Sequence, residues 1–193
     1  MKQKIQAKDL INVGIFTAIM FVVSMAVAML GYIPIFIPLL SVLVPLIGGI
    51  PFMLFLTKVK KFGLVTIMAA LIGIIIGLMG MGVWVIFTAP LFGVLADLVF
   101  KSGGYVSVKK SILGYGIFSM WVIGNFIPIV ITRSNYYEML ISGYGQEYAD
   151  TLMGYMPDWS LLPLLVACFV SGLLGALLGR SLLKKHFIRA GIA

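Results

Sequence analysis

The feature that most constrains this chain is a succession of long apolar runs, separated by short links rich in lysine or glycine. Of its 193 residues, 62% are hydrophobic and only 10% are charged, whereas charged residues make up about a quarter of a typical soluble domain. Most of the chain therefore has lipid as its solvent. In lipid, every backbone polar group must be paired within the protein, and helices achieve this locally. The sequence predicts an all-α polytopic membrane protein.

Hydropathy and length divide the chain into six expected transmembrane helices within a single integral membrane domain, residues 1–193. Each apolar run approaches the roughly 20 residues that a spanning helix needs. Glycine, proline or lysine marks the boundaries between the runs. The expected spans are residues 10–30, 39–57, 62–79, 83–100, 111–131 and 159–183, with a long outer loop at 132–158.

The distribution of lysine and arginine orients these helices. With the N-terminus inside, 13 of the 14 basic residues fall on the inner side, and only Arg133 falls outside. This asymmetry predicts that both termini face the cytoplasm. It also explains the net charge of +8 as an attraction to the lipid bilayer, so nucleic acid is not an expected partner. The inner bases are Lys2, Lys4, Lys8, Lys58, Lys60, Lys61, Lys101, Lys109, Lys110, Arg180, Lys184, Lys185 and Arg189.

The sequence lacks the groups that membrane enzymes commonly use. It has no Walker or HExxH motif and no pair of carboxylates within a span, and it has one cysteine, Cys168, and one histidine, His186. We therefore expect no enzymatic activity, no catalytic or metal-binding residue and no cofactor. Asp97, near the inner end of the fourth expected span, is followed at i+4 by Lys101. This spacing favours an ion pair between them, with contact to a partner protein as the alternative.

Polar and aromatic residues near the outer ends of the spans form the candidate substrate site. Asn125 lies near the outer end of the fifth expected span, one helical turn from Trp121 on the same face. Together they can hold a flat polar heterocycle by hydrogen bonding and stacking, although an interhelical hydrogen bond by Asn125 fits equally well. Arg133 can bind an anionic or carbonyl group of a ligand, or pair with Glu138, and the pairing is slightly favoured.

Two further aromatic features lie at the outer side. Trp84 and Trp159 begin spans there, and interfacial anchoring is the usual role of tryptophan at this position. Loop 132–158 carries five tyrosines and four carboxylates, and it is long for a bundle with short connections. It is either an interfacial belt on an amphipathic helix or a lid over bound cargo.

Small residues at helical spacing allow close helix contacts. In the third and sixth spans we expect such residues to serve packing within the molecule; they are Gly73, Gly77, Gly172, Gly175, Ala176 and Gly179. In the first span, Gly14 and Ala18 lie near the inner end of the helix. There a partner protein can dock.

Several stretches of the chain are distinctive: GIPFMLFLTKVKKFG (49–63), Ala96-Asp97 before KSGGY (101–105), residues 142–148, Pro157-Asp158-Trp159, and the ending GALLGRSLLKKHFIRAGIA (175–193). They resemble the Trep_Strep family of membrane proteins and, more broadly, the S-components of energy-coupling factor (ECF) transporters. The resemblance covers nearly the whole chain and includes the six expected spans and the absence of an ATPase motif.

The resemblance implies a role in micronutrient uptake across the bacterial plasma membrane. An S-component binds a small molecule, often a vitamin or a precursor, near the extracellular side. It docks through its first helices on a transmembrane coupling protein driven by two cytoplasmic ATPase subunits. The Ala-xxx-Ala docking motif of the family corresponds here to Gly14-xxx-Ala18. The usual position of the pocket implies, as substrate-binding residues, Trp84, Trp121, Asn125, Arg133 and Trp159.

Two other functions stay open beside this substrate-binding subunit. An autonomous channel or facilitator would move a small solute without partners. A membrane enzyme acting on lipid headgroups would use carboxylates of the outer loop, such as Glu138 or Asp150, but the lack of a metal-ligand cluster counts against it. The sequence favours the transport subunit and does not identify its substrate.

Overall fold

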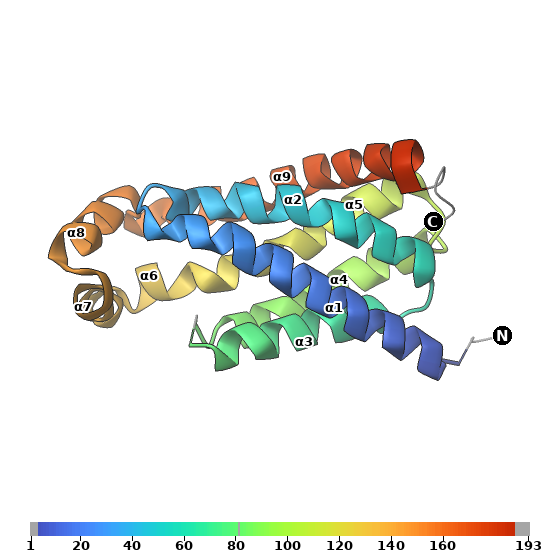
Figure 1. The fold of residues 1–193 in the computed structure, drawn as a ribbon, viewed down its shortest axis with the longest axis horizontal. Coiled ribbons are helices and arrows are strands. Elements are labelled where there is room, and N and C mark those ends of the chain that lie inside the picture. The colour runs from blue at the N-terminus through green and yellow to red at the C-terminus, as the bar shows by residue number, and fades with distance from the viewer. Residues whose placement is uncertain (1–3, 81, 188–193) are drawn as a thin grey trace.

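The computed structural model describes residues 4–80 and 82–187, and these residues form an elongated helical bundle (Figure 1). Its α-helices are α1 (Ala7–Ala28), α2 (Phe36–Lys58), α3 (Leu64–Leu78), α4 (Val85–Ser102), α5 (Val108–Ser119), α6 (Ile127–Ile131), α7 (Arg133–Tyr144), α8 (Gln146–Tyr155) and α9 (Leu161–Leu182). Short 3-10 segments are η1 (Met29–Tyr32), η2 (Met120–Asn125) and η3 (Asp158–Ser160), and a π turn, η4 (Leu183–Phe187), follows α9.

Four helical stretches in the described part are long and apolar enough to cross a membrane: Ala7–Tyr32, Phe36–Lys58, Val85–Ser102 and Asp158–Lys185. The third expected span corresponds to α3, which has only 15 residues. At 1.5 Å per residue it is about 22 Å long, shorter than the roughly 30 Å of a hydrocarbon core. The structure therefore supports several membrane spans, while the number six stays a prediction.

The start of α1 and the end of α9 lie at the same end of the bundle, opposite α7 and α8 (Figure 1). This arrangement is compatible with the charge asymmetry of the sequence. That this end faces the cytoplasm stays a prediction from the positive-inside rule. Lys2 and Arg189, which contribute to that prediction, lie outside the described residues.

The fifth expected span, residues 111–131, is interrupted in the structure. Helix α5 ends at Ser119, the 3-10 segment η2 follows, and the five-residue helix α6 completes the stretch. Gly124 lets η2 approach α4 closely, because a Cβ atom at this position would lie 2.3 Å from the Thr88 hydroxyl and 2.8 Å from the Val85 Cα. The Thr88 hydroxyl donates to the Trp121 carbonyl at 3.0 Å, which ties the interrupted segment to its neighbour.

Helices α2 and α9 pack so closely that their backbones touch. A Cβ atom at Gly49 would lie 2.2 Å from the Gly175 carbonyl group, and one at Gly179 would lie 2.4 Å from the Gly49 oxygen. Pro45 has no N–H for the Ser41 carbonyl one turn earlier, and this carbonyl accepts a hydrogen bond from the α9 hydroxyl of Ser171 at 3.2 Å. The predicted intramolecular role of the small residues in α9 is confirmed.

Helices α3 and α4 form the second close pair. A Cβ atom at Gly73 would lie 2.8 Å from the Val85 oxygen and 2.9 Å from the Ala89 Cβ, and one at Gly77 would meet the side chain of Ile86 at 2.4 Å. These contacts confirm that the small residues of the third expected span serve packing within the molecule.

The predicted ion pair between Asp97 and Lys101 is wrong. Asp97 is fully buried, and one of its oxygens accepts bonds from the backbone N–H groups of Gly63 and Thr66 at 2.9 and 3.0 Å. The carboxylate thus satisfies donors at the start of α3 that have no partner within the helix. The Tyr105 hydroxyl donates to its other oxygen at 2.9 Å. Lys101 instead lies 5.0 Å above the Phe62 ring.

Candidate functional site

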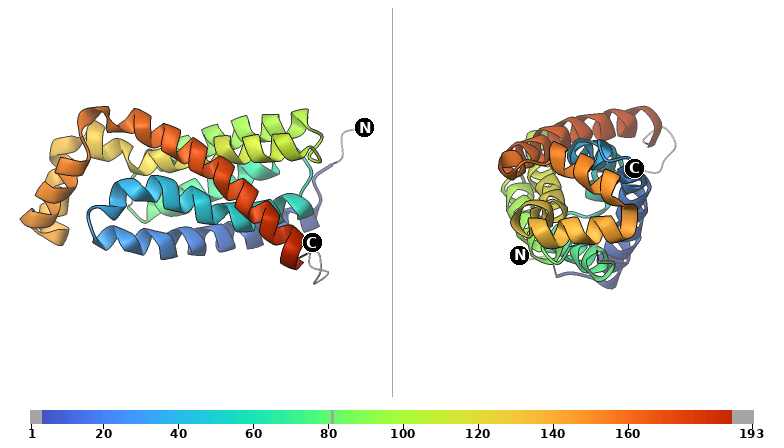
Figure 2. Two further views of the ribbon diagram at one scale, coloured as in Figure 1. Left: turned by 90° about the horizontal axis from the view of Figure 1, so that it is seen from above. Right: turned by 90° about the vertical axis from the view of Figure 1, so that its left-hand side faces the viewer.

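Helices α7 and α8, residues 133–155, form a cap across the end of the bundle opposite the start of α1, where the sequence predicts an outer loop. Figure 2 shows both helices crossing this end, roughly perpendicular to the bundle axis. They meet at Gly145, whose φ of 88° lies in the left-handed region that glycine adopts without strain. The underside of the cap is apolar and packed, since Leu140, Ala149 and Leu152 are buried.

Tyrosines connect the cap to the link between α1 and α2. The Tyr148 hydroxyl donates to the Gly31 carbonyl at 2.5 Å, across 117 residues of sequence. Its ring stacks on Tyr144 with 4.8 Å between centroids, and Tyr144 lies 6.2 Å from Tyr32. Burial raises the pKa of Tyr148 from its ordinary value of 10 to about 12, so the phenol stays protonated and able to donate well above neutral pH. The cap is therefore tied to the first helices and not only to its own neighbours.

Arg133, the only base predicted on the outer side, stabilises the end of α8. Its guanidinium donates to the carbonyls of Met156 at 2.6 Å and Met153 at 3.0 Å, which are acceptors near a helix C-terminus. It also reaches Asp158 at 3.3 Å. The favoured pairing with Glu138 is therefore wrong, because the guanidinium turns toward α8 and the start of η3.

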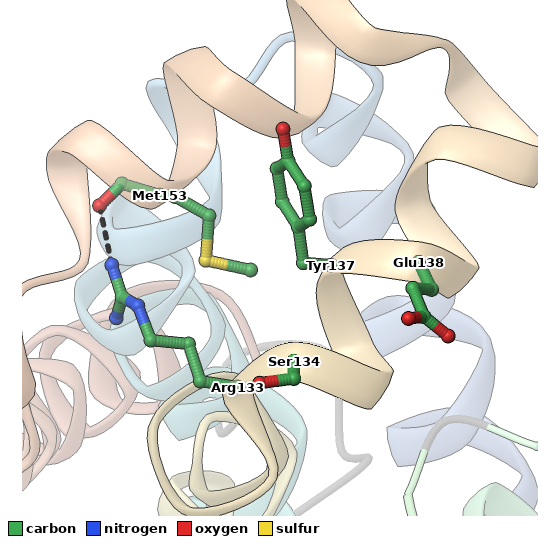
Figure 3. A pocket seen from close by; sticks show the side chains of 5 residues that line it. All are labelled: Arg133, Ser134, Tyr137, Glu138 and Met153. Carbon is green, nitrogen blue, oxygen red and sulfur yellow. Dashed lines mark hydrogen bonds between the residues drawn. The ribbon is translucent and has the colours of Figure 1, made fainter.

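An open hollow of about 350 Å³ lies between α7 and α8, lined by Arg133, Ser134, Tyr137, Glu138 and Met153. Figure 3 shows Arg133 and Met153 at one side of this cap hollow and Tyr137 beside them. The Tyr137 hydroxyl donates to the Asp150 carboxylate at 2.5 Å, and this hydrogen bond raises the pKa of Tyr137. The lining of the cap hollow thus includes one cation, one carboxylate and two hydroxyl groups.

The two deeper candidate residues lie inside the protein. Trp121 is 3% exposed, and its carbonyl is the acceptor for Thr88. Asn125 is half-buried, and its Nδ2 donates to the Val122 carbonyl at 3.1 Å. This bond stays within η2, so it is not the predicted interhelical bond, and the contact of Asn125 with a ligand stays a prediction. Neither residue lines the cap hollow.

The two remaining tryptophans stand at the surface. Trp84 is 38% exposed and directly precedes α4, and Trp159 is 71% exposed within η3. Neither lines the cap hollow, so of the five candidate substrate residues only Arg133 does. Their exposure fits the anchoring role of interfacial aromatic residues.

Gly14 and Ala18 are exposed on α1, unlike the small residues of α2, α3 and α9. A Cβ atom added at Gly14 would have no neighbouring atom within 4 Å. Nothing inside the molecule therefore requires a small side chain at this position. The surface that the sequence predicts for partner docking is open.

Sequence reasoning did not single out three residues of the cap hollow, Ser134, Tyr137 and Met153, and it named Glu138 only as a partner of Arg133 or as a catalytic carboxylate of a membrane enzyme. The tyrosine-rich composition of residues 132–158 pointed to the right segment. The pairing of α7 with α8 was needed to bring Tyr137 and Met153 together. Within residues 4–80 and 82–187, no three histidine, cysteine or acidic side chains gather where they could hold a metal ion.

Several apolar helices of spanning length, with large apolar side chains on their outer faces, define an integral membrane protein. A family model described as "Hypothetical bacterial integral membrane protein (Trep_Strep)" matches residues 7–189. The chain belongs to this family and is a multi-pass bacterial membrane protein. No curated protein and no solved structure gives a match to the chain.

Proposed function

We propose that this protein is the substrate-binding subunit of an ECF-type importer in the bacterial plasma membrane. It captures a small micronutrient, such as a vitamin or a precursor, at the outer side of the membrane. A transmembrane coupling protein and two ATPase subunits then supply the energy for uptake. The chain has no Walker motif of its own, so it needs such partners to perform active transport.

The observation that carries this proposal is the open face of α1. Gly14 and Ala18 leave a smooth strip beside the exposed side chains of Ile11 and Ile15. Such a strip lets a second helix approach the backbone closely, which is how small residues promote helix association in lipid. The strip matches the position of the docking motif in S-components, and no helix within residues 4–80 and 82–187 covers it.

The cap supports the proposal that the substrate is captured at the outer side. Its hollow is lined by the charged side chains of Arg133 and Glu138 and by the hydroxyl groups of Ser134 and Tyr137. These groups suit a ligand that carries both hydrogen-bond donors and acceptors. The cap is also tied to Gly31, next to the outer end of α1. A movement of α1 against the coupling protein therefore reaches the substrate side through the Tyr148 bond.

Affinity capture from the native bacterium tests the partnership. The tagged wild-type chain, purified in a mild detergent, is expected to retain a transmembrane protein and two ATPase subunits. Gly14→Leu combined with Ala18→Leu fills the strip and is expected to reduce this recovery at least about tenfold, because close approach of the backbones is lost.

A matched variant enlarges exposed side chains on another helix. Val170→Phe combined with Leu174→Phe, on the exposed face of α9, is expected to leave partner recovery unchanged. Equal recovery by the α1 variant and the wild type would contradict the assigned docking face. Failure of the wild type to retain any ATPase would contradict the proposed function itself.

A further inference from the structure

A second hollow, of about 460 Å³, lies at the end of the bundle opposite the cap. It is bordered by the segment that begins α1 and by the turn between α2 and α3. Five lysines line it beside a single carboxylate, which leaves a formal charge of +4; these residues are Lys4, Lys8, Lys58, Lys60, Lys61 and Asp9. We propose that this basic hollow binds the phosphate headgroup of an anionic phospholipid.

An internal ion pair builds this hollow from two distant parts of the chain. Lys61 Nζ lies 2.6 Å from the Asp9 carboxylate and also donates to the Lys4 carbonyl at 3.1 Å. The same Asp9 oxygen accepts the Gln6 N–H at 2.8 Å, which fixes the first turn of α1. The Asp9 and Lys61 side chains are only 8% and 15% exposed. The ion pair therefore acts as a clamp that holds the remaining lysines around one concave surface.

The surroundings of the hollow favour a lipid over a soluble phosphate. Leu10 and Ile11 follow Asp9 directly and are 48% and 62% exposed, and Phe62, next to Lys61, is 45% exposed. Apolar surface thus lies beside the positive charge. A phospholipid joins a phosphate to acyl chains in the same way, and clustered lysines at a membrane surface attract anionic headgroups. Inorganic or sugar phosphates would leave the apolar side chains without a partner.

The test measures lipid binding to the purified full-length protein by native mass spectrometry. Phosphatidylglycerol is compared with phosphatidylcholine of the same acyl chains, and glycerol 3-phosphate serves as the soluble competitor. We expect phosphatidylglycerol to bind at least about tenfold more tightly, and Lys8→Gln with Lys60→Gln to remove about tenfold of its affinity. Lys109→Gln with Lys110→Gln removes the same charge away from the hollow and is expected to change the affinity less than about twofold.

Asp9→Asn distinguishes lipid binding in a specific site from non-specific electrostatic attraction of the lipid to the lysines. This substitution makes the protein more positive, so diffuse electrostatics predicts tighter lipid binding. If the Asp9–Lys61 ion pair shapes the hollow, lipid binding becomes weaker, because Lys61 loses its carboxylate partner. Tighter binding by Asp9→Asn, an equal loss in the Lys109/Lys110 variant, or no preference for phosphatidylglycerol would overturn the proposal. Displacement of the lipid by glycerol 3-phosphate would overturn it in favour of a soluble phosphate ligand.

Discussion

Helices α1 and α9 carry the same pattern of small residues but use it differently. On α9, Gly175 and Gly179 press against the backbone of α2 at distances that no Cβ atom tolerates. On α1, Gly14 faces open space and Ala18 is exposed. The small-residue face of α9 is covered by α2, and that of α1 is open to lipid or to another protein. A small-xxx-small pattern therefore predicts a close contact without saying whether the partner belongs to the same chain.

Adding a single methyl group at different glycines tests this difference between α9 and α1. The only cysteine, Cys168, is fully buried in α9, so its reaction with a thiol-specific fluorophore reports unfolding of the detergent-purified protein. Each variant can thus be compared with the wild type by its apparent melting temperature.

Gly49→Ala is expected to have the largest effect. The new Cβ would lie 2.2 Å from the Gly175 carbonyl group, and backbone atoms cannot rotate away as a side chain can. We expect α2 and α9 to separate at a cost of about 3 kcal/mol, the upper end of ordinary overpacking. An unchanged melting temperature would show that the close contact between α2 and α9 does not stabilise the bundle.

Gly77→Ala is expected to have an intermediate effect. Its Cβ would meet the Ile86 side chain at 2.4 Å, and Ile86 is only half-buried. The isoleucine can shift toward the surface, so we expect a loss of about 1 kcal/mol. A fall in melting temperature as large as that of Gly49→Ala would mean that backbone and side-chain contacts are equally rigid here.

Gly14→Ala is expected to have the smallest effect on the isolated protein, with the opposite sign. Alanine gains up to about 1 kcal/mol over glycine in a helix interior, and the added methyl group touches nothing. The melting temperature should stay constant or rise slightly. A clear fall would show that the α1 face is already occupied, for example by a second copy of the chain.

Much of the fold could be predicted from the sequence because lipid imposes simple rules. Apolar runs must become helices, and the elements α1, α2, α4 and α9 begin and end near the predicted boundaries. The interruption of the fifth expected span at η2 was not predicted, because the whole stretch is apolar and hydropathy does not distinguish an α-helix from a 3-10 segment. Gly124 and Pro128 were the local signs of it.

Side-chain partners across long sequence distances could not be predicted. Asp97 has a lysine at i+4, yet its donors include Gly63 and Thr66, more than 30 residues away. The carboxylate therefore stabilises the start of α3 in place of a surface ion pair. Likewise, Arg133 binds carbonyls of α8 that only the folded cap brings near. Spacing along the sequence predicts which side chains are neighbours on one helix, but tertiary packing determines which partner a polar side chain binds.

Native mass spectrometry of the protein purified from cells grown in rich medium tests whether this chain holds a substrate at its outer side, as proposed. We expect one bound small molecule of about the size of a vitamin. Glu138→Gln, which changes the cap hollow without touching the Arg133 contacts, should reduce its occupancy. Glu147→Gln, on the same cap but outside the hollow, should not. A folded wild-type protein that carries no small molecule after growth in rich medium would show that the chain does not capture a substrate in this way.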